Sequence, residues 1–165
     1  MGCRIVEAKN VDLREYDGKW YEVASLPAWF QRGCENTTAE YTIKDDYVEV
    51  LNTCEKGGKI KERKGKAFET TKENVLKVQF FPLIKSDYII EFVDQNYNYA
   101  IVGSSNKRYL WILSRHSCID YEDINYLVKI AKEKGYDVSR LNFQNLDECV
   151  LVEIVVGEEE LCIYF

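Results

Sequence analysis

The sequence has little histidine and proline and fewer basic than acidic residues, and each of these features excludes some classes of protein. His116 is the single histidine, so a histidine-rich zinc site is excluded and a Ser-His-Asp triad depends on that one residue. The 22 lysines and arginines face 28 aspartates and glutamates, and the resulting net charge of −6 argues against non-specific nucleic-acid binding. With only two prolines and as many as 12 tyrosines, the composition favours strands.

Long apolar runs are also missing. No segment approaches the roughly 20 apolar residues of a membrane-spanning helix. Near the start, Arg4, Glu7 and Lys9 interrupt the apolar core that a secretory signal needs. We therefore expect a cytoplasmic or membrane-associated protein, or a secreted or periplasmic one if a signal has been removed. Its 165 residues, 46% of them hydrophobic, suit a single domain over 1–165.

What the sequence does contain is a succession of short alternating segments. Gly57-Gly58 is the strongest hairpin signal, because two glycines accept the positive φ of a tight turn. Such segments, at spacings of about 8–12 residues, predict eight strands over 18–26, 38–44, 47–54, 59–70, 74–81, 88–94, 99–104 and 109–115. The pattern predicts an all-β antiparallel barrel or sandwich. Because apolar and polar residues alternate, each strand has one buried and one solvent-exposed face, which favours a closed barrel over a buried parallel sheet.

The periodicity changes after the last of these strands. Ile124, Leu127 and Ala131 recur at helical spacing, Asp120 is suited to cap the helix, and Gly135 is suited to end it. We expect one amphipathic helix that packs against the barrel wall.

The C-terminal tail, residues 146–165, carries two apolar runs around Gly157 and is predicted to form a hairpin or an added strand. Exposed, it would be an aggregation-prone edge. It must therefore pack on its own barrel, pair with a second copy as a docking edge, or lie on a membrane.

Three motifs in the right order resemble the lipocalins. Gly18-Lys19-Trp20 opens the first strand, 94–100 (DQNYNYA) supplies a turn, and 109–115 (YLWILSR) ends in Arg115. The resemblance covers about 11–145. Further motifs at 30–33 and 135–139 are similar to those of one subgroup, which holds the bacterial outer-membrane lipocalins, the plant temperature-induced lipocalins and apolipoprotein D.

The resemblance implies an eight-stranded up-and-down barrel with one flanking helix, closed at one end by Gly18, Trp20 and Arg115. A guanidinium over an indole face gives a cation–π contact of roughly 0.5–2 kcal/mol. The family places the positions of Tyr41 and Trp111 in a ligand cavity. Alternate residues of a strand point to the same face, and this alternation, called strand parity below, adds further positions. The residues predicted to line the cavity are Tyr41, Val50, Val78, Phe80, Tyr88, Ile90, Phe92 and Trp111.

The implied function is binding and carriage or storage of a small hydrophobic ligand, with a fatty acid or a lysophospholipid as the expected type. Neither a cofactor nor a metal is expected, and no catalytic residue is predicted. Trp29 and Phe30 lie in a loop without strand pattern, where they either touch a membrane surface or pack on the barrel. Monomer and homodimer are both consistent with the sequence.

Six cysteines permit three disulfides or a reduced protein. The resemblance to apolipoprotein D implies a bridge between Cys34 and Cys149. Cys54 shares strand parity with Val50, and a thiol-dependent isomerase using Cys54 is the alternative hypothesis, although the sequence identifies no base or cation to activate it. No two cysteines are closer than Cys149 and Cys162, which lie 13 apart, so a structural zinc site is not expected.

Overall fold

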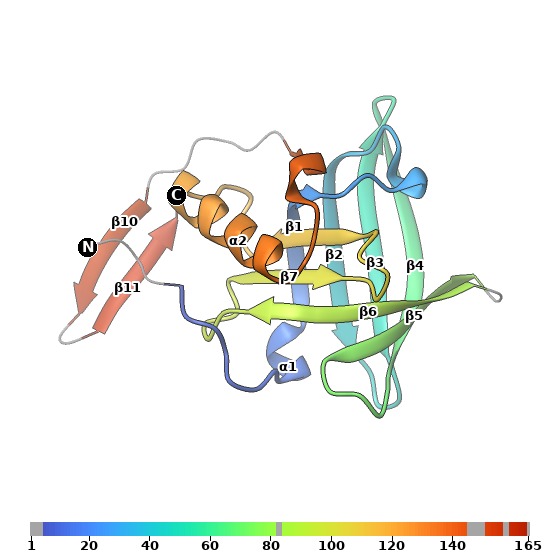
Figure 1. Ribbon diagram of the computed structural model, residues 1–165, viewed down its shortest axis with the longest axis horizontal. Helices are drawn as coiled ribbons and strands as arrows, with labels where there is room; N and C mark the ends of the chain where they lie inside the picture. The colour runs from blue at the N-terminus through green and yellow to red at the C-terminus, as the bar shows by residue number, and fades with distance from the viewer. Residues whose placement is uncertain (1–4, 82–83, 145–150, 157–158, 165) are drawn as a thin grey trace.

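Antiparallel strands make up most of the chain in the computed structural model, which describes residues 5–81, 84–144, 151–156 and 159–164 (Figure 1). The helical elements are α1 (Leu13–Tyr16), η1 (Trp29–Gln31), α2 (Tyr121–Glu133) and η2 (Val138–Arg140). The strands are β1 (Gly18–Ser25), β2 (Glu35–Ile43), β3 (Val48–Lys56), β4 (Lys59–Glu69), β5 (Val75–Phe81), β6 (Ile84–Val93), β7 (Tyr99–Gly103), β8 (Leu110–Ser114), β9 (Asn142–Phe143), β10 (Leu151–Val156) and β11 (Glu159–Tyr164).

Strands β1 to β8 form a closed up-and-down barrel. Each pairs with the next in sequence, and β8 returns to pair with β1. The glycine pair Gly57-Gly58 turns β3 into β4 with positive φ at both residues, as its sequence predicts. The predicted barrel is therefore confirmed, and β9 adds a short ninth strand beside the end of β1.

Strand β1 changes partners along its length. One edge pairs with β2 as far as Tyr21 opposite Thr38 and then with β9 at Ala24 and Ser25. The other edge pairs with β8 from Tyr21 to Ser25. The pairing of β1 with β8 shifts register between Glu22 and Ala24. The pairing of β1 with β2 thus ends before Glu22.

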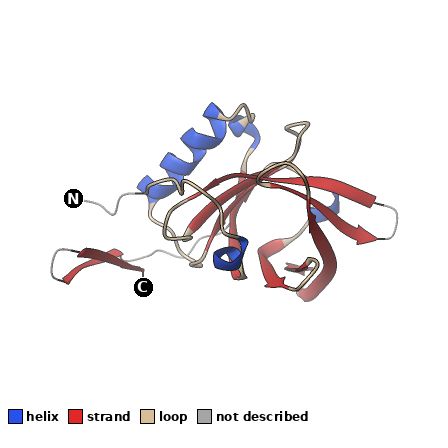
Figure 2. Ribbon diagram, turned by 90° about the horizontal axis from the view of Figure 1, so that it is seen from below, coloured by secondary structure: helices blue, strands red, loops and turns tan. Residues whose placement is uncertain are grey.

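The buried side chains form two layers on either side of the barrel wall. An inner cluster contains Trp20 and Tyr41, whereas an outer cluster contains Ile101 and Leu127. Helix α2 supplies Leu127 and lies along the outside of the barrel (Figure 2). The Asp120 side chain accepts a hydrogen bond from the backbone N–H of Glu122, so the predicted cap and helix are confirmed.

The tail strands β10 and β11 pair with each other in a sheet separate from that of the barrel. The predicted hairpin is therefore present, and the role of the tail as a docking edge stays a prediction. Among the described residues, no helix is long and apolar enough to cross a membrane.

Arg115 and Trp20 close one end of the barrel. The Arg115 guanidinium carbon lies 3.9 Å from the centroid of the Trp20 ring, and Trp20 is fully buried. Gly18 has φ +102°, and a Cβ there would lie 3.1 Å from Nη1 of Arg115. Glycine at this position therefore serves both the backbone conformation and the close approach of the guanidinium.

The disulfide pairing differs from the expectation. Cys34 is bonded to Cys54, with their Cα atoms 5.4 Å apart, so the expected bridge from Cys34 to Cys149 is wrong. The physical reason is that Glu35 pairs with Glu55 where β2 begins and β3 ends, which brings the two adjacent cysteines within bridging distance. Cys118 is also disulfide-bonded, and Cys149 lies outside the described residues.

We predict that Trp20→Ala lowers the free energy of unfolding by about 3–5 kcal/mol, because it removes a large buried ring and the contact with Arg115. Urea denaturation followed by circular dichroism measures the change. Trp29→Ala is the matched control, since Trp29 is 71% exposed, and it should shift stability by less than about 0.5 kcal/mol. Equal effects of the two substitutions would contradict the closed-end assignment.

We also predict that a tryptic digest of non-reduced protein contains residues 33–44 linked to residues 45–56, because Cys34 and Cys54 fall in these two peptides. Mass spectrometry before and after reduction checks the linkage. A digest in which 33–44 is linked instead to 141–165, the peptide that carries Cys149, would show that the pairing is wrong.

Candidate functional site

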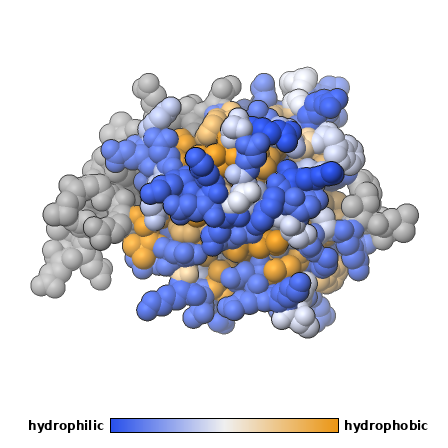
Figure 3. All heavy atoms as spheres, viewed as in Figure 1, coloured by the Kyte–Doolittle hydropathy of each residue, from blue (hydrophilic) through white to orange (hydrophobic). Residues whose placement is uncertain are grey.

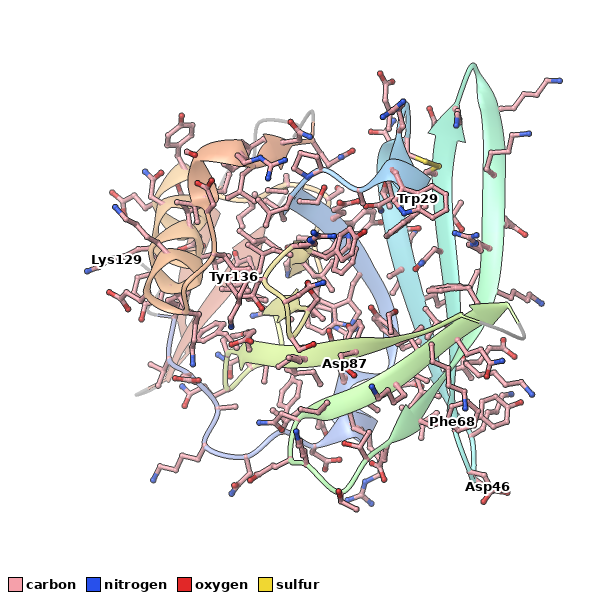
Figure 4. The ribbon with its side chains drawn as sticks, turned by 45° about the vertical axis from the view of Figure 1, so that its right-hand side comes forward. Trp29, Asp46, Phe68, Asp87, Lys129 and Tyr136 are labelled. Carbon is pink, nitrogen blue, oxygen red and sulfur yellow. A yellow bond between two sulfur atoms is a disulfide. The ribbon has the colours of Figure 1, made fainter. Side chains whose placement is uncertain are left out.

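A cavity of about 250 Å³ occupies the barrel at the end away from Arg115. The loop that carries Trp29 lies over this end beside the β3–β4 hairpin, whereas Asp46 lies at the opposite end (Figure 4). The lining is mainly apolar, with a few polar groups, which is typical of a small-molecule site. The residues that line it include Glu22, Gln31, Tyr41, Val50, Arg63, Val78, Phe80, Asp87, Tyr88 and Trp111.

Most of the positions that strand parity assigns to the cavity do lie in its wall. These lining residues are Tyr41, Val50, Val78, Phe80, Tyr88 and Trp111. Ile90 belongs to the inner core cluster rather than to the cavity wall. Phe92 was expected inside but packs in the outer cluster, because a register shift between Ile90 and Phe92 in β6 reverses the parity. That the lining residues contact a ligand stays a prediction.

Three tyrosine hydroxyls meet at the inner end of the cavity. The Tyr88 hydroxyl lies 2.7 Å from those of both Tyr16 and Tyr41. Burial raises the pKa of Tyr41 to about 12 and raises the pKa values of Tyr16 and Tyr88. All three therefore stay protonated at neutral pH and form a polar but uncharged end to an apolar cavity.

Glu22 places a carboxyl group in the cavity wall at the point where β1 and β2 separate. It is 5% exposed, and its Oε2 accepts a hydrogen bond of 3.5 Å from Nε2 of Gln31. Gln31 Oε1 in turn accepts a hydrogen bond of 3.0 Å from Nε1 of Trp111. The loop between β1 and β2, residues 26–34, lies at the open end of the barrel and is called the mouth loop below. The side chain of Gln31 thus connects this loop to two residues of the barrel wall.

The other carboxyl oxygen of Glu22, Oε1, is buried and has no hydrogen-bond partner among the described residues. Burial raises the pKa of Glu22, and the polar side chains of Ser25, Thr37 and Gln31 oppose this effect. Sequence reasoning missed Glu22, although it shares strand parity with Trp20 two positions earlier. That parity was the signal that could have found it.

The mouth loop divides its two aromatic residues between the barrel and the surface. The Phe30 ring lies 5.6 Å from that of Tyr109 and 6.4 Å from that of Trp111, between ring centroids, so Phe30 packs on the barrel. Trp29 is exposed. A second hollow of about 510 Å³ lies between this loop and β9, and Glu22 and Gln31 line both hollows.

Ionic groups also reach the cavity from β4 and β6. The Arg63 guanidinium lies 5.5 Å from the centroid of the Phe80 ring. Asp87 pairs with Lys77 and accepts a 2.7 Å hydrogen bond from Oγ of Ser105, and these bonds lower the pKa of Asp87.

The outer face of the molecule seen in Figure 3 is mostly hydrophilic, with smaller apolar areas between the hydrophilic ones.

Comparison with known proteins matches residues 11–145 to the family model of the lipocalin-like domain. The chain belongs to the lipocalin family. It is 39% identical to the outer membrane lipoprotein Blc of Vibrio cholerae, over 80% of this chain and 81% of that protein. It is 36% identical to temperature-induced lipocalin-1 of Arabidopsis thaliana, with 81% and 78% covered. Mouse apolipoprotein D is 31% identical, with 86% and 80% covered. The subgroup resemblance is thereby confirmed.

Solved structures agree on the fold. The lipocalin barrel superposes on apocrustacyanin C2 with a TM-score of 0.70 and 19% identity, over 82% of this chain and 80% of that one. At this identity, the similarity extends to the arrangement of strands alone.

The isomerase hypothesis loses its nucleophile in this lipocalin. The Cys54 sulfur is bonded to Cys34, so no thiolate can form there in the oxidised protein. Within the part of the chain that the structure describes, no three histidine, cysteine, aspartate or glutamate side chains cluster to hold a metal ion.

We predict that Glu22→Gln makes the lipocalin more stable at neutral pH. Because the pKa of Glu22 is higher in the folded than in the unfolded protein, the folded state binds the proton more tightly, and stability falls as pH rises from the unfolded pKa through the folded one. The amide that replaces the carboxyl group does not ionise, so the gain in melting temperature over the wild type should grow from about pH 4, near the pKa of an unfolded glutamate, to neutral pH.

Differential scanning calorimetry across this pH range measures the effect. Glu40→Gln is the matched control, because Glu40 is exposed on β2 and its removal changes the net charge equally. Melting curves of Glu22→Gln that run parallel to those of Glu40→Gln at every pH would contradict the prediction.

Proposed function

We propose that the protein binds and carries a small hydrophobic ligand in the barrel cavity, with a single-chain lipid such as a fatty acid or a lysophospholipid as the type. The observation that carries the proposal is the cavity itself. Arg115 and Trp20 close one end of the barrel, whereas the other end holds an apolar hollow with a few hydrogen-bonding groups. Such a cup shelters an acyl chain from water and leaves a polar head near the mouth.

The driving force for binding is the removal of the acyl chain from water. At roughly 25 cal/mol per Å², burial of about 300 Å² of chain offers near 7 kcal/mol before the association entropy is subtracted. Val50 and Val78 supply apolar wall for the chain. Release needs no chemistry, because partition between cavity and membrane is reversible.

Two observations support action at a membrane surface. Trp29 is 71% exposed on the mouth loop, where an indole can enter a lipid headgroup layer. Among the relatives, the Vibrio cholerae protein is named an outer membrane lipoprotein. We therefore propose a membrane-associated or periplasmic location, from which a lipid reaches the cavity directly.

A pair of neighbouring substitutions tests the cavity. Val50 faces inward and is 3% exposed, whereas Leu51 is partly exposed and does not line the cavity. Val50→Phe should occupy cavity space and weaken binding of a lysophospholipid or a fatty acid by at least about tenfold, and Leu51→Phe should leave it unchanged. Isothermal titration calorimetry on delipidated protein measures both. Equal affinities of the two variants would place the ligand outside the barrel.

A further inference from the structure

The unpartnered oxygen of Glu22 marks a site within the cavity wall that the chain itself leaves incomplete. Gln31 donates a hydrogen bond to Oε2 of Glu22. Oε1 is buried and accepts no hydrogen bond from the described residues, although the side chains of Ser25 and Thr37 lie near enough to lower the pKa of the carboxyl group. A buried acceptor without a donor loses the hydrogen bonds that water would give it, so it favours a ligand that restores one. Because Glu22 lines the cavity, a ligand that fills this space can supply the missing donor.

We infer that Glu22 Oε1 is the acceptor for a hydrogen-bond-donating head group, so that the cavity prefers single-chain amphiphiles ending in a hydroxyl or an ammonium group over those ending in a carboxylate. This inference rests on the proposed function and narrows it at the same site. Of the two proposed lipid types, it favours a lysophospholipid, which carries a free hydroxyl, over a fatty acid, which ends in a carboxylate. The head lies beside Gln31 and Trp111 near the mouth, and the chain lies along the apolar wall.

The chemistry of the carboxyl group sets this preference. An ionised carboxylate only accepts hydrogen bonds, so it pairs with a hydroxyl or an ammonium group and repels a second carboxylate. An ammonium group also supplies the opposite charge, which favours the ionised form of a buried acid. A hydroxyl both donates and accepts, and it therefore suits Glu22 in either protonation state.

Arg63 is the competing anchor. Its guanidinium carbon lies 5.5 Å from the Phe80 centroid, and the residue lines the same cavity. A ligand held by Arg63 would carry a negatively charged head, which is the opposite preference. Glu22 is favoured as the anchor because it is 5% exposed and lacks a partner at Oε1, whereas Arg63 is only partly buried.

Three ligands that share a decyl chain and differ only in the head group distinguish Glu22 from Arg63 as the anchor. We would titrate delipidated wild-type protein with 1-decanol, decylammonium and decanoate at neutral pH by isothermal titration calorimetry. We expect decanol and decylammonium to bind at least about tenfold more tightly than decanoate. This comparison needs no variant and remains informative even if a substitution prevents folding.

Glu22→Gln then tests the residue, with Glu40→Gln as the control of equal charge. We expect Glu22→Gln to lose about tenfold or more in affinity for decylammonium, to gain affinity for decanoate, and to keep that for decanol within about threefold. Glu40→Gln should match the wild type for all three ligands.

Two results overturn the inference and leave the proposed function in place. One is a wild type that prefers decanoate, which would assign the head group to Arg63. The other is a Glu22→Gln variant with the ligand preferences of Glu40→Gln. Failure of all three ligands, and of lysophospholipid, to bind a folded wild type would overturn the proposed function as well.

Discussion

The stacking of Arg115 on Trp20 is the contact on which the rest of the barrel depends. The guanidinium donates hydrogen bonds to three backbone carbonyls, those of Glu15, Lys19 and Tyr97, at 2.8, 3.1 and 3.2 Å. It thereby joins α1, β1 and the turn between β6 and β7 to the end of β8. Because one end is closed in this way, the cavity lies at the other end of the barrel.

The second constraint is the change of partner along β1. The strand pairs with β2 as far as Tyr21, and Glu22 then stands where the two strands separate. The disulfide between Cys34 and Cys54 holds the start of β2 to the end of β3 on the far side of this separation. The mouth loop lies between these elements and presents Gln31 to both Glu22 and Trp111. Closure at one end and separation at the other together place a carboxyl group in an apolar wall.

Much of the fold followed from the sequence, because alternation fixes which face of a strand is buried. Val50, Val78 and Trp111 line the cavity as their parity requires. Phe92 does not line the cavity, because the pairing of β6 shifts register between Ile90 and Phe92, and no residue type in that strand indicates the shift. Parity reasoning therefore succeeds in regular strands and fails at an irregularity such as this one.

The sequence did not predict the cysteine pairing or the Glu22 carboxyl group in the cavity wall, and the reasons differ. Cys34 and Cys54 approach each other through the register of β2 and β3, which the hydrophobic pattern does not encode. Glu22 had the right parity, but a charged residue is not expected in an apolar wall. The tail hairpin was visible in its two apolar runs around Gly157, yet its pattern does not say which surface it covers.

The central claim is that the barrel holds a lipid, and native mass spectrometry of protein purified without detergent tests it most directly. We expect the intact protein to carry a mass increment that organic extraction removes, and we expect the extract to contain one class of single-chain amphiphile. A folded protein that shows only the mass of its polypeptide, and that still takes up no lipid when vesicles are added, would contradict the account.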